Sequence, residues 1–111
     1  MIDLKQKELA DWQHANFGEV SSETLALGMA EEVGELCHAL LKRKQRIREG
    51  ASGNDLRPEI ADAFADCVIY GINIMEQEDI DAESVLASVI GKVLKRDWVK
   101  YPSNGEGIKN E

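Results

Sequence analysis

LALGMAEEVGELCHALLKRKQRI, residues 25–47, decides the fold, because no proline interrupts this long run of helix-forming residues. Ser21 and Ser22 are suitable N-terminal caps and Glu23 falls in the first turn, so the sequence predicts a helix that runs to about Arg48. Basic side chains suit the negative end of a helix dipole, and they gather in the last turns: Lys42, Arg43, Lys44, Arg46 and Arg48.

The spacing of apolar residues predicts two more helices, one on each side of this stretch. The first runs from Leu4 to Asn16 and stops before Gly18. The second runs from Pro58 to about Met75 and follows a loop, residues 49–57, that concentrates Gly, Ser, Asn and Asp. Its apolar residues recur every three or four positions and make one stripe: Ile60, Phe64, Val68, Ile72 and Met75.

A last helix is expected to begin at Asp81 and to continue to about Tyr101 and Pro102. Residues 103–111 are polar and form a tail after a single domain, residues 1–102. The fold class is therefore all-α, with four to five helices. A chain of 111 residues leaves broad helix faces uncovered, so we expect a homodimer or homotetramer to complete the helical bundle.

Charge and hydropathy narrow the class of partner. The formal net charge of −8 excludes a nucleic acid polymer, whose phosphates require many Lys and Arg. It is compatible with one small anion that binds through Mg²⁺, because the ion supplies the positive charge. No stretch approaches the roughly 18 consecutive apolar residues of a membrane span. We therefore expect a cytoplasmic protein that acts on a small molecule and does not bind a membrane.

The first of two acidic clusters lies in the long helix, where Glu31, Glu32 and Glu35 form an EExxE pattern. Residues three or four apart lie on neighbouring turns of one helix surface, so Glu32 and Glu35 can converge on one ion. Three like charges this close repel one another unless a cation lies between them. A solvated helix face is the alternative interpretation.

The second cluster forms a polar stripe on the helix that begins at Pro58. At 100° per residue, its members fall within an arc of about 80°, roughly opposite the apolar stripe. No Lys or Arg relieves the repulsion among the acids of this stripe. Two antiparallel acidic helices would supply carboxylates to Mg²⁺, and water and substrate phosphates would complete its octahedral shell. The stripe consists of Glu59, Asp62, Asp66, Tyr70 and Asn73.

With these clusters the chain resembles the MazG-like all-α nucleoside triphosphate pyrophosphohydrolases, which are related to phosphoribosyl-ATP pyrophosphohydrolase and the dimeric dUTPases. The resemblance extends from about Trp12 to Pro102. It is carried by MAEEVGEL at residues 29–36, by EIADAFADCVIY at residues 59–70 and, more weakly, by KVLKRDWVKYP at residues 92–102. It implies Mg²⁺-dependent, or Mn²⁺-dependent, hydrolysis of a nucleoside or deoxynucleoside triphosphate to the monophosphate and pyrophosphate, for nucleotide pool sanitation or control.

The resemblance also implies roles for the acids of the long helix. The second and third acids of the family's EExxE motif ligate Mg²⁺, which corresponds to Glu32 and Glu35 here. The first acid orients the attacking water, which corresponds to Glu31. Tyr70 matches a position that often faces the nucleotide.

The family's second motif, ExxD, fits this chain in two registers. Read literally, it gives Glu59 and Asp62. The hydrophobic residues that follow the family's Asp align better with residues 67–70, which selects Asp66 and puts Ala63 at the position of the Glu. Both registers stay open, so we expect metal ligands among Glu59, Asp62 and Asp66.

Basic and aromatic residues are further candidates for substrate binding. Lys92, Lys95 and Arg96, with Lys100, can share one face of the last helix and reach phosphates, although a solvated face is an equal alternative. An aromatic face with nearby amides suits a nucleobase, and Trp12, His14, Asn16 and Phe17 offer one. Core packing is the more usual role of Trp12 and Phe17.

Two other classes of protein fit the sequence less well. One is a non-catalytic acidic helical module for oligomerisation or partner binding, which Ala63 at the motif's Glu position favours. The other is a di-iron carboxylate protein, because Glu35 and His38 form a Glu-x-x-His pair. Such sites need two pairs, and His14 has no matching Glu three residues earlier.

Overall fold

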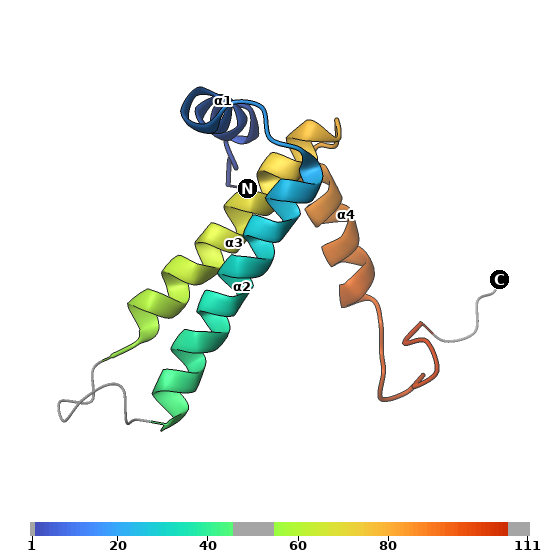
Figure 1. Ribbon diagram of the computed structural model, residues 1–111. Helices are drawn as coiled ribbons and strands as arrows, with labels where there is room; N and C mark the ends of the chain where they lie inside the picture. The colour runs from blue at the N-terminus through green and yellow to red at the C-terminus, as the bar shows by residue number, and fades with distance from the viewer. Residues whose placement is uncertain (1, 46–54, 107–111) are drawn as a thin grey trace.

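The computed structural model describes residues 2–45 and 55–106, and within these ranges the chain forms four α-helices and no strand (Figure 1). They are α1 (Gln6–Phe17), α2 (Ser22–Gln45), α3 (Arg57–Gln77) and α4 (Ala82–Leu94). The predicted all-α fold is confirmed. Of the predicted segments, residues 46–54 and the end of the polar tail, residues 107–111, lie outside the described residues.

The two long helices, α2 and α3, lie side by side and run antiparallel (Figure 1). Leu25 and Ala39 of α2 are buried in their interface, and Ala63, Cys67 and Ile72 of α3 are buried as well. Most of these side chains are small, which lets the two backbones approach closely along their length. The core of the protomer is therefore a narrow seam between two helices.

The apolar stripe predicted for α3 packs only in part against α2. Ile72 is buried, but Phe64 is 62% exposed. In the middle of α3, the side chains that meet α2 are instead Ala63 and Cys67. On the helix surface these two residues lie between the apolar stripe and the acidic stripe. The packed face of α3 thus lies between its apolar and its acidic residues, and this rotation turns the acids toward α2.

Helix α1 packs against the C-terminal half of α3 (Figure 1). Its first residue, Gln6, fixes this position through its side-chain amide. Gln6 Nε2 donates to the carbonyl oxygen of Ile80 at 2.7 Å, and Gln6 Oε1 accepts from the backbone N–H of Ala82 at 2.8 Å. Because Ile80 lies in the turn before α4 and Ala82 is the first residue of α4, one side chain ties α1 to the α3–α4 junction.

Helix α4 begins as predicted and ends earlier than predicted. The carboxylate of Asp81 caps the N-terminus of α4 by accepting a hydrogen bond from the N–H of Ser84 at 3.0 Å. Hydrogen bonds from the backbone and the side chain of Ser84 lower the pKa of Asp81. The helix stops at Leu94 and does not continue to Tyr101. The prediction of a longer helix was wrong.

The early end of α4 has a local cause in the residues that follow it. The Asp97 carboxylate accepts from the N–H groups of Val99 and Lys100, at 3.1 and 2.8 Å, which folds the chain into a turn instead of a helix. Gly105 returns to this turn, donates to the carbonyl oxygen of Tyr101 at 2.7 Å and lies under the ring of Trp98. Its φ of +73° and the nearby indole leave no room for a side chain.

Helix α4 leaves much of its apolar surface uncovered, because it meets the rest of the protomer only near the end of α3 (Figure 1). None of the helices in the described residues is both long and apolar enough to span a membrane. Large exposed apolar patches of this kind are uncommon on monomeric proteins. The exposed residues are Val85, Leu86, Val89, Ile90, Val93 and Leu94.

Candidate functional site

A hollow of about 500 Å³ lies between α2 and α3, and the predicted acids of both helices line it. The two clusters are far apart in the sequence, and the antiparallel packing of the helices brings them to one place. The lining residues are Glu31, Glu32, Glu35, His38, Ala39, Glu59, Asp62, Ala63 and Asp66. We call this the acidic hollow.

Glu32 is the acid that the fold holds most firmly toward α3. It is half-buried, and it lies on the side of α2 that also carries the buried residues Leu25 and Ala39, each about two helical turns away, one on either side along the helix. Glu31 and Glu35 are exposed, and both lie to one side of Glu32 on the helix surface. The EExxE spacing therefore puts one carboxylate into the helix seam and two beside it.

The electrostatics of the acidic hollow favour a bound cation. Partial burial raises the pKa of Glu32, and the negative charges of Asp66, Glu31 and Glu35 raise it further. Asp66 is the α3 acid that contributes to this shift. A side-chain hydrogen bond between Glu32 and Asp66, which requires a proton on one of the two carboxyl groups, also raises the pKa of Glu32. The carboxylates of α2 and α3 therefore repel one another across the seam.

Basic residues relieve little of this repulsion. Lys42 Nζ lies 3.3 Å from Glu59 Oε2, at the end of the hollow next to the last turn of α2. Within residues 2–45 and 55–106, no other acid of the hollow forms an ion pair with a Lys or Arg. Glu59 is thus the one acid of the hollow with a cationic partner in the described part of the chain.

These carboxylates match the chemistry of a hard divalent cation, because Mg²⁺ and Mn²⁺ prefer oxygen ligands. In the described part of the chain, however, no three His, Cys, Asp or Glu side chains are placed so that they could hold a metal ion as they stand. The fold assembles the ligand types around one hollow, and a coordination shell requires side-chain rotation from these positions.

A second hollow, of about 510 Å³, adjoins the first and shares Glu32 and Asp66 with it. We call it the aromatic hollow. Trp12 and Phe17 of α1 meet edge to face in its wall, with ring centroids 5.8 Å apart. Tyr70 of α3 is also in the wall, together with Leu9, Gln13, Ile69 and Asn73.

Trp12 and Phe17 do not belong to the protomer core. They are 53% and 63% exposed, so the usual role of core packing was the wrong expectation for both within the protomer. Asn16 donates from Nδ2 to the carbonyl oxygen of Trp12 at 2.8 Å and so supports the end of α1. His14 lines a neighbouring hollow on the other side of Gln13. Of the four residues predicted to contact a base, only Trp12 and Phe17 line the aromatic hollow.

Tyr70 is positioned by a glycine that sequence reasoning missed. A Cβ atom at Gly28 of α2 would lie 2.4 Å from Cε1 of Tyr70, so the tyrosine ring rests directly on the helix backbone there. A glycine inside a helix is unfavourable by roughly 1 kcal/mol relative to alanine and so often marks a close contact. That signal was present in the sequence, and only the packing of α2 on α3 shows which contact it serves.

The predicted phosphate-binding residues do not share a helix face. Lys92 lies in the last turn of α4, Lys95 is its C-cap, and Arg96 follows the helix. Arg96 Nε lies 3.5 Å from Glu106 Oε2, and Lys100 Nζ lies 5.6 Å from the centroid of the Tyr101 ring. Within one protomer none of the four lines the acidic or the aromatic hollow.

A model of the MazG nucleotide pyrophosphohydrolase domain matches residues 20–99, which is more than half of the chain. The chain belongs to the MazG family. A search of curated proteins and a search of solved structures each gave no match. Family membership supports a nucleotide pyrophosphohydrolase activity.

The MazG match covers α2, α3 and α4 and therefore includes both acidic clusters. It leaves α1 outside, although α1 supplies Trp12, Gln13 and Phe17 to the aromatic hollow. The family assignment and the acidic hollow thus rest on the same helices, whereas the part of the aromatic hollow that α1 supplies lies outside the matched residues. The resemblance seen in the EExxE and ExxD motifs is confirmed at the level of the family.

Proposed function

We propose that the chain is a Mg²⁺-dependent hydrolase that converts nucleoside or deoxynucleoside triphosphates to the monophosphate and pyrophosphate, with Mn²⁺ able to replace Mg²⁺. The observation that carries this proposal is the acidic hollow, where carboxylates from α2 and α3 face one another across a half-buried Glu32. A MazG domain supplies the reaction class. The proposed setting is the cytoplasm and the control or sanitation of nucleotide pools.

Each acid has a proposed role in this reaction. Glu32, Glu35 and Asp66 would hold the metal, with Asp62 and Glu59 as further ligands. A bound Mg²⁺ neutralises phosphate charge and lowers the pKa of a water molecule. Glu31 lines the same hollow at its exposed edge, where its carboxylate can orient that water and accept its proton.

Two observations support the register that selects Asp66 over the literal one. Asp66 is the α3 acid whose charge reaches Glu32, whereas Glu59 is engaged by Lys42 at the far end of the hollow. Ala63 stands at the Glu position of this register and is buried in the seam with α2. Asp62 and Glu59 would then supply the carboxylate that Ala63 lacks.

The adjoining hollow suggests how the nucleotide lies. Because both hollows share Glu32 and Asp66, a triphosphate at the acids would place its base beside Trp12, Tyr70 and Asn73. Aromatic rings bind a flat base by stacking, which is tolerant of its identity. We propose that these three residues contact the nucleoside part of the substrate.

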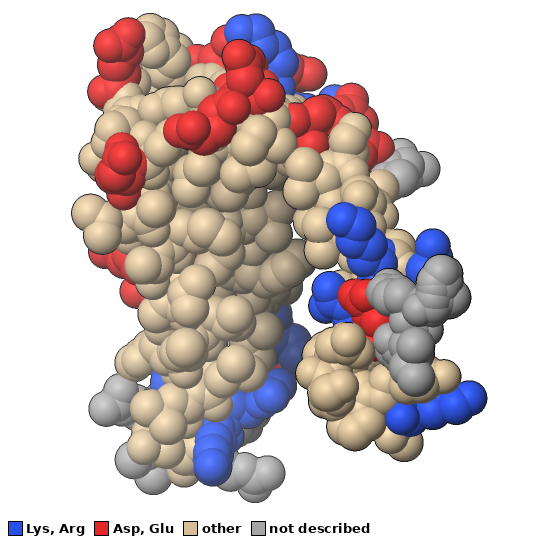
Figure 2. Space-filling model, turned by 90° about the vertical axis from the view of Figure 1, so that its right-hand side faces the viewer, with Lys and Arg blue, Asp and Glu red and all other residues tan. Residues whose placement is uncertain are grey.

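We also propose a homodimer or homotetramer, in which helix faces left bare in one protomer pack against a second copy. Figure 2 shows a broad surface with few charges on one side of the molecule, and Lys and Arg gathered toward one end. In such an assembly α4 of a second copy can bring Lys92, Lys95 and Arg96 to the phosphates. The apolar row of α4 and the exposed Leu27, Val33 and Leu41 of α2 support this packing.

The experiment that tests the activity is pyrophosphate release from all common NTPs and dNTPs with Mg²⁺ or Mn²⁺. Glu35→Gln and Asp66→Asn are expected to lower kcat/KM by at least about 100-fold, because each removes a ligand charge from the reacting phosphates. Absence of release from every nucleotide would favour a non-catalytic oligomerisation module. Full activity in Asp66→Asn with loss in Glu59→Gln would establish the literal ExxD register instead.

A further inference from the structure

Asn73 of α3 is a buried amide without a complete set of partners. Its side chain is 4% exposed. Within residues 2–45 and 55–106, its Oδ1 is the single buried side-chain oxygen or nitrogen that lacks a hydrogen-bond partner. Buried polar atoms are almost always satisfied, so an unpartnered one calls for an explanation, and a ligand is one of the few available.

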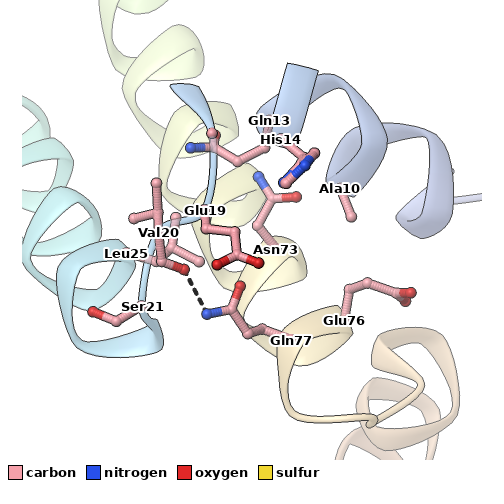
Figure 3. A pocket seen from close by; sticks show the side chains of 11 residues that line it. Ala10, Gln13, His14, Glu19, Val20, Ser21, Leu25, Asn73, Glu76 and Gln77 are labelled. Carbon is pink, nitrogen blue, oxygen red and sulfur yellow. Dashed lines mark hydrogen bonds between the residues drawn. The ribbon is translucent and has the colours of Figure 1, made fainter. Parts of the chain in front are cut away.

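The position of Asn73 points to such a ligand. It lines the aromatic hollow on one side, and on the other side it lines a third hollow of about 590 Å³ between α1, the start of α2 and the end of α3. Figure 3 shows its amide extending from α3 toward Gln13 and His14 of α1. Gln13 also lines both hollows, so the two residues stand where the hollows meet.

Two carboxylates are among the side chains that line the third hollow. The carboxylates of Glu19 and Glu76 line that hollow together with Asn73 (Figure 3). Ligand groups that donate hydrogen bonds are favoured there, and carbonyl oxygens of a ligand are repelled. Because an amide oxygen only accepts hydrogen bonds, the unpartnered Oδ1 of Asn73 selects a ligand group that donates one.

We propose that Asn73 determines base specificity and selects nucleotides whose base carries an exocyclic amino group, by accepting a hydrogen bond from that group. This inference rests on the proposed function, because it places the base in the aromatic hollow when the triphosphate is at Glu32 and Asp66. Trp12 and Tyr70 contact the faces of the base, and its amino edge points past Asn73 toward Glu19 and Glu76. Cytosine and adenine have the amino group, and uracil and hypoxanthine carry a carbonyl oxygen in its place.

Two matched pairs of nucleotides test the inference. CTP differs from UTP, and ATP from ITP, in an amino group replaced by a carbonyl oxygen and in the adjacent ring nitrogen, which changes from an acceptor to an N–H donor. We expect kcat/KM to be at least about tenfold higher for CTP than for UTP and for ATP than for ITP, because a site built for a donor rejects an analogue without it. Equal turnover within both pairs, or a preference for UTP and ITP, would overturn the inference.

Variants of Asn73 separate base selection from a structural role. Asn73→Leu keeps the size and removes the acceptor, and it is expected to bring both ratios close to one. Asn73→Asp keeps an acceptor and is expected to retain the preference for the amino base. A purely structural Asn73 would lower kcat/KM for all four nucleotides by the same factor and leave the ratios unchanged, which would contradict the proposal.

A binding measurement keeps this test independent of the proposed hydrolysis. CMP and UMP are titrated into the full chain while the fluorescence of Trp12 and Trp98 is followed, with Trp98→Phe to assign the signal to Trp12. Tighter binding of CMP in the wild type but not in Asn73→Leu would support amino-group selection even if no triphosphate is hydrolysed. Identical affinities for CMP and UMP would refute it, whatever the hydrolysis assay shows.

Discussion

Gly28→Ala in α2 is the substitution whose consequence follows most directly from the packing of α2 on α3. Its Cβ would stand 2.4 Å from Cε1, 2.6 Å from Cζ and 2.9 Å from the hydroxyl oxygen of Tyr70. Ordinary van der Waals contact begins at 3.4 Å, so the ring must move by about 1 Å. The ring is half-buried in the wall of the aromatic hollow, so this movement displaces a proposed substrate contact.

Gly34→Ala provides the matched control, because it lies in the same helix and its Cβ would meet nothing within 4 Å. Alanine stabilises a helix interior by roughly 1 kcal/mol relative to glycine, and both variants gain this amount. Only Gly28→Ala also crowds a neighbour, which costs about 1–3 kcal/mol. Gly28→Ala is therefore expected to be about 1–3 kcal/mol less stable than Gly34→Ala in urea unfolding.

The activity of the two variants should separate as well. A shift of about 1 Å in a substrate contact can lower the rate by up to about 100-fold, so we expect kcat/KM of Gly28→Ala to fall by about 10- to 100-fold in pyrophosphate release. Combining Gly28→Ala with Tyr70→Ala removes the collision, and the added alanine should then stabilise the protein as it does at Gly34. If Gly28→Ala matches Gly34→Ala in both stability and activity, Tyr70 is not seated on α2 and the reasoning fails.

Three further predictions concern charge and assembly. Partial burial and the surrounding carboxylates raise the pKa of Glu32, so the metal-free protein should lose stability as the pH rises through that pKa. Glu32→Gln should remove this loss of stability, which thermal unfolding at neutral pH measures. The same variant should abolish hydrolysis. Hydrogen bonds from Ser84 lower the pKa of Asp81, so its contribution is present above the ordinary aspartate pKa of about 4 and is lost as the pH falls below it. Asp81→Ala should therefore destabilise α4 at pH 7, seen as faster amide hydrogen exchange, with little difference from the wild type near pH 2. Val89→Asp on the exposed row of α4 should shift the protein to monomer in analytical ultracentrifugation, whereas an unchanged mass would remove α4 from the interface.

The sequence was sufficient to predict where three helices begin, because their N-termini carry strong local signals. Ser21 precedes α2 and Ser22 is its first residue, Pro58 stands in the first turn of α3, and Asp81 caps α4. The EExxE spacing and the acidic stripe also predicted that both clusters would meet, because residues on one face of each helix move together when the helices pack. These features depend on neighbouring residues and on helical periodicity alone.

Features that depend on residues distant in the sequence could not be predicted from local patterns. The rotation of α3 that puts Ala63 in the seam and leaves Phe64 exposed is set by the opposing surface of α2, which periodicity does not describe. The end of α4 at Leu94 depends on the turn at Asp97 and on Gly105, which returns from eight residues farther along. The exposure of Trp12 follows from where α1 docks on α3, and no local pattern determines that position.

Binding of Mn²⁺ to the full chain tests the central claim most directly, because it asks whether α2 and α3 hold a divalent cation between them without requiring turnover. Electron paramagnetic resonance of free Mn²⁺ is followed as protein is added, for the wild type, Glu32→Gln, Asp66→Asn and the control Glu23→Gln, which lies in the first turn of α2 outside the acidic hollow. We predict saturable binding by the wild type and by Glu23→Gln, and at least about tenfold weaker binding by Glu32→Gln and by Asp66→Asn. Equal binding by all four proteins, or none by the wild type, would contradict the account.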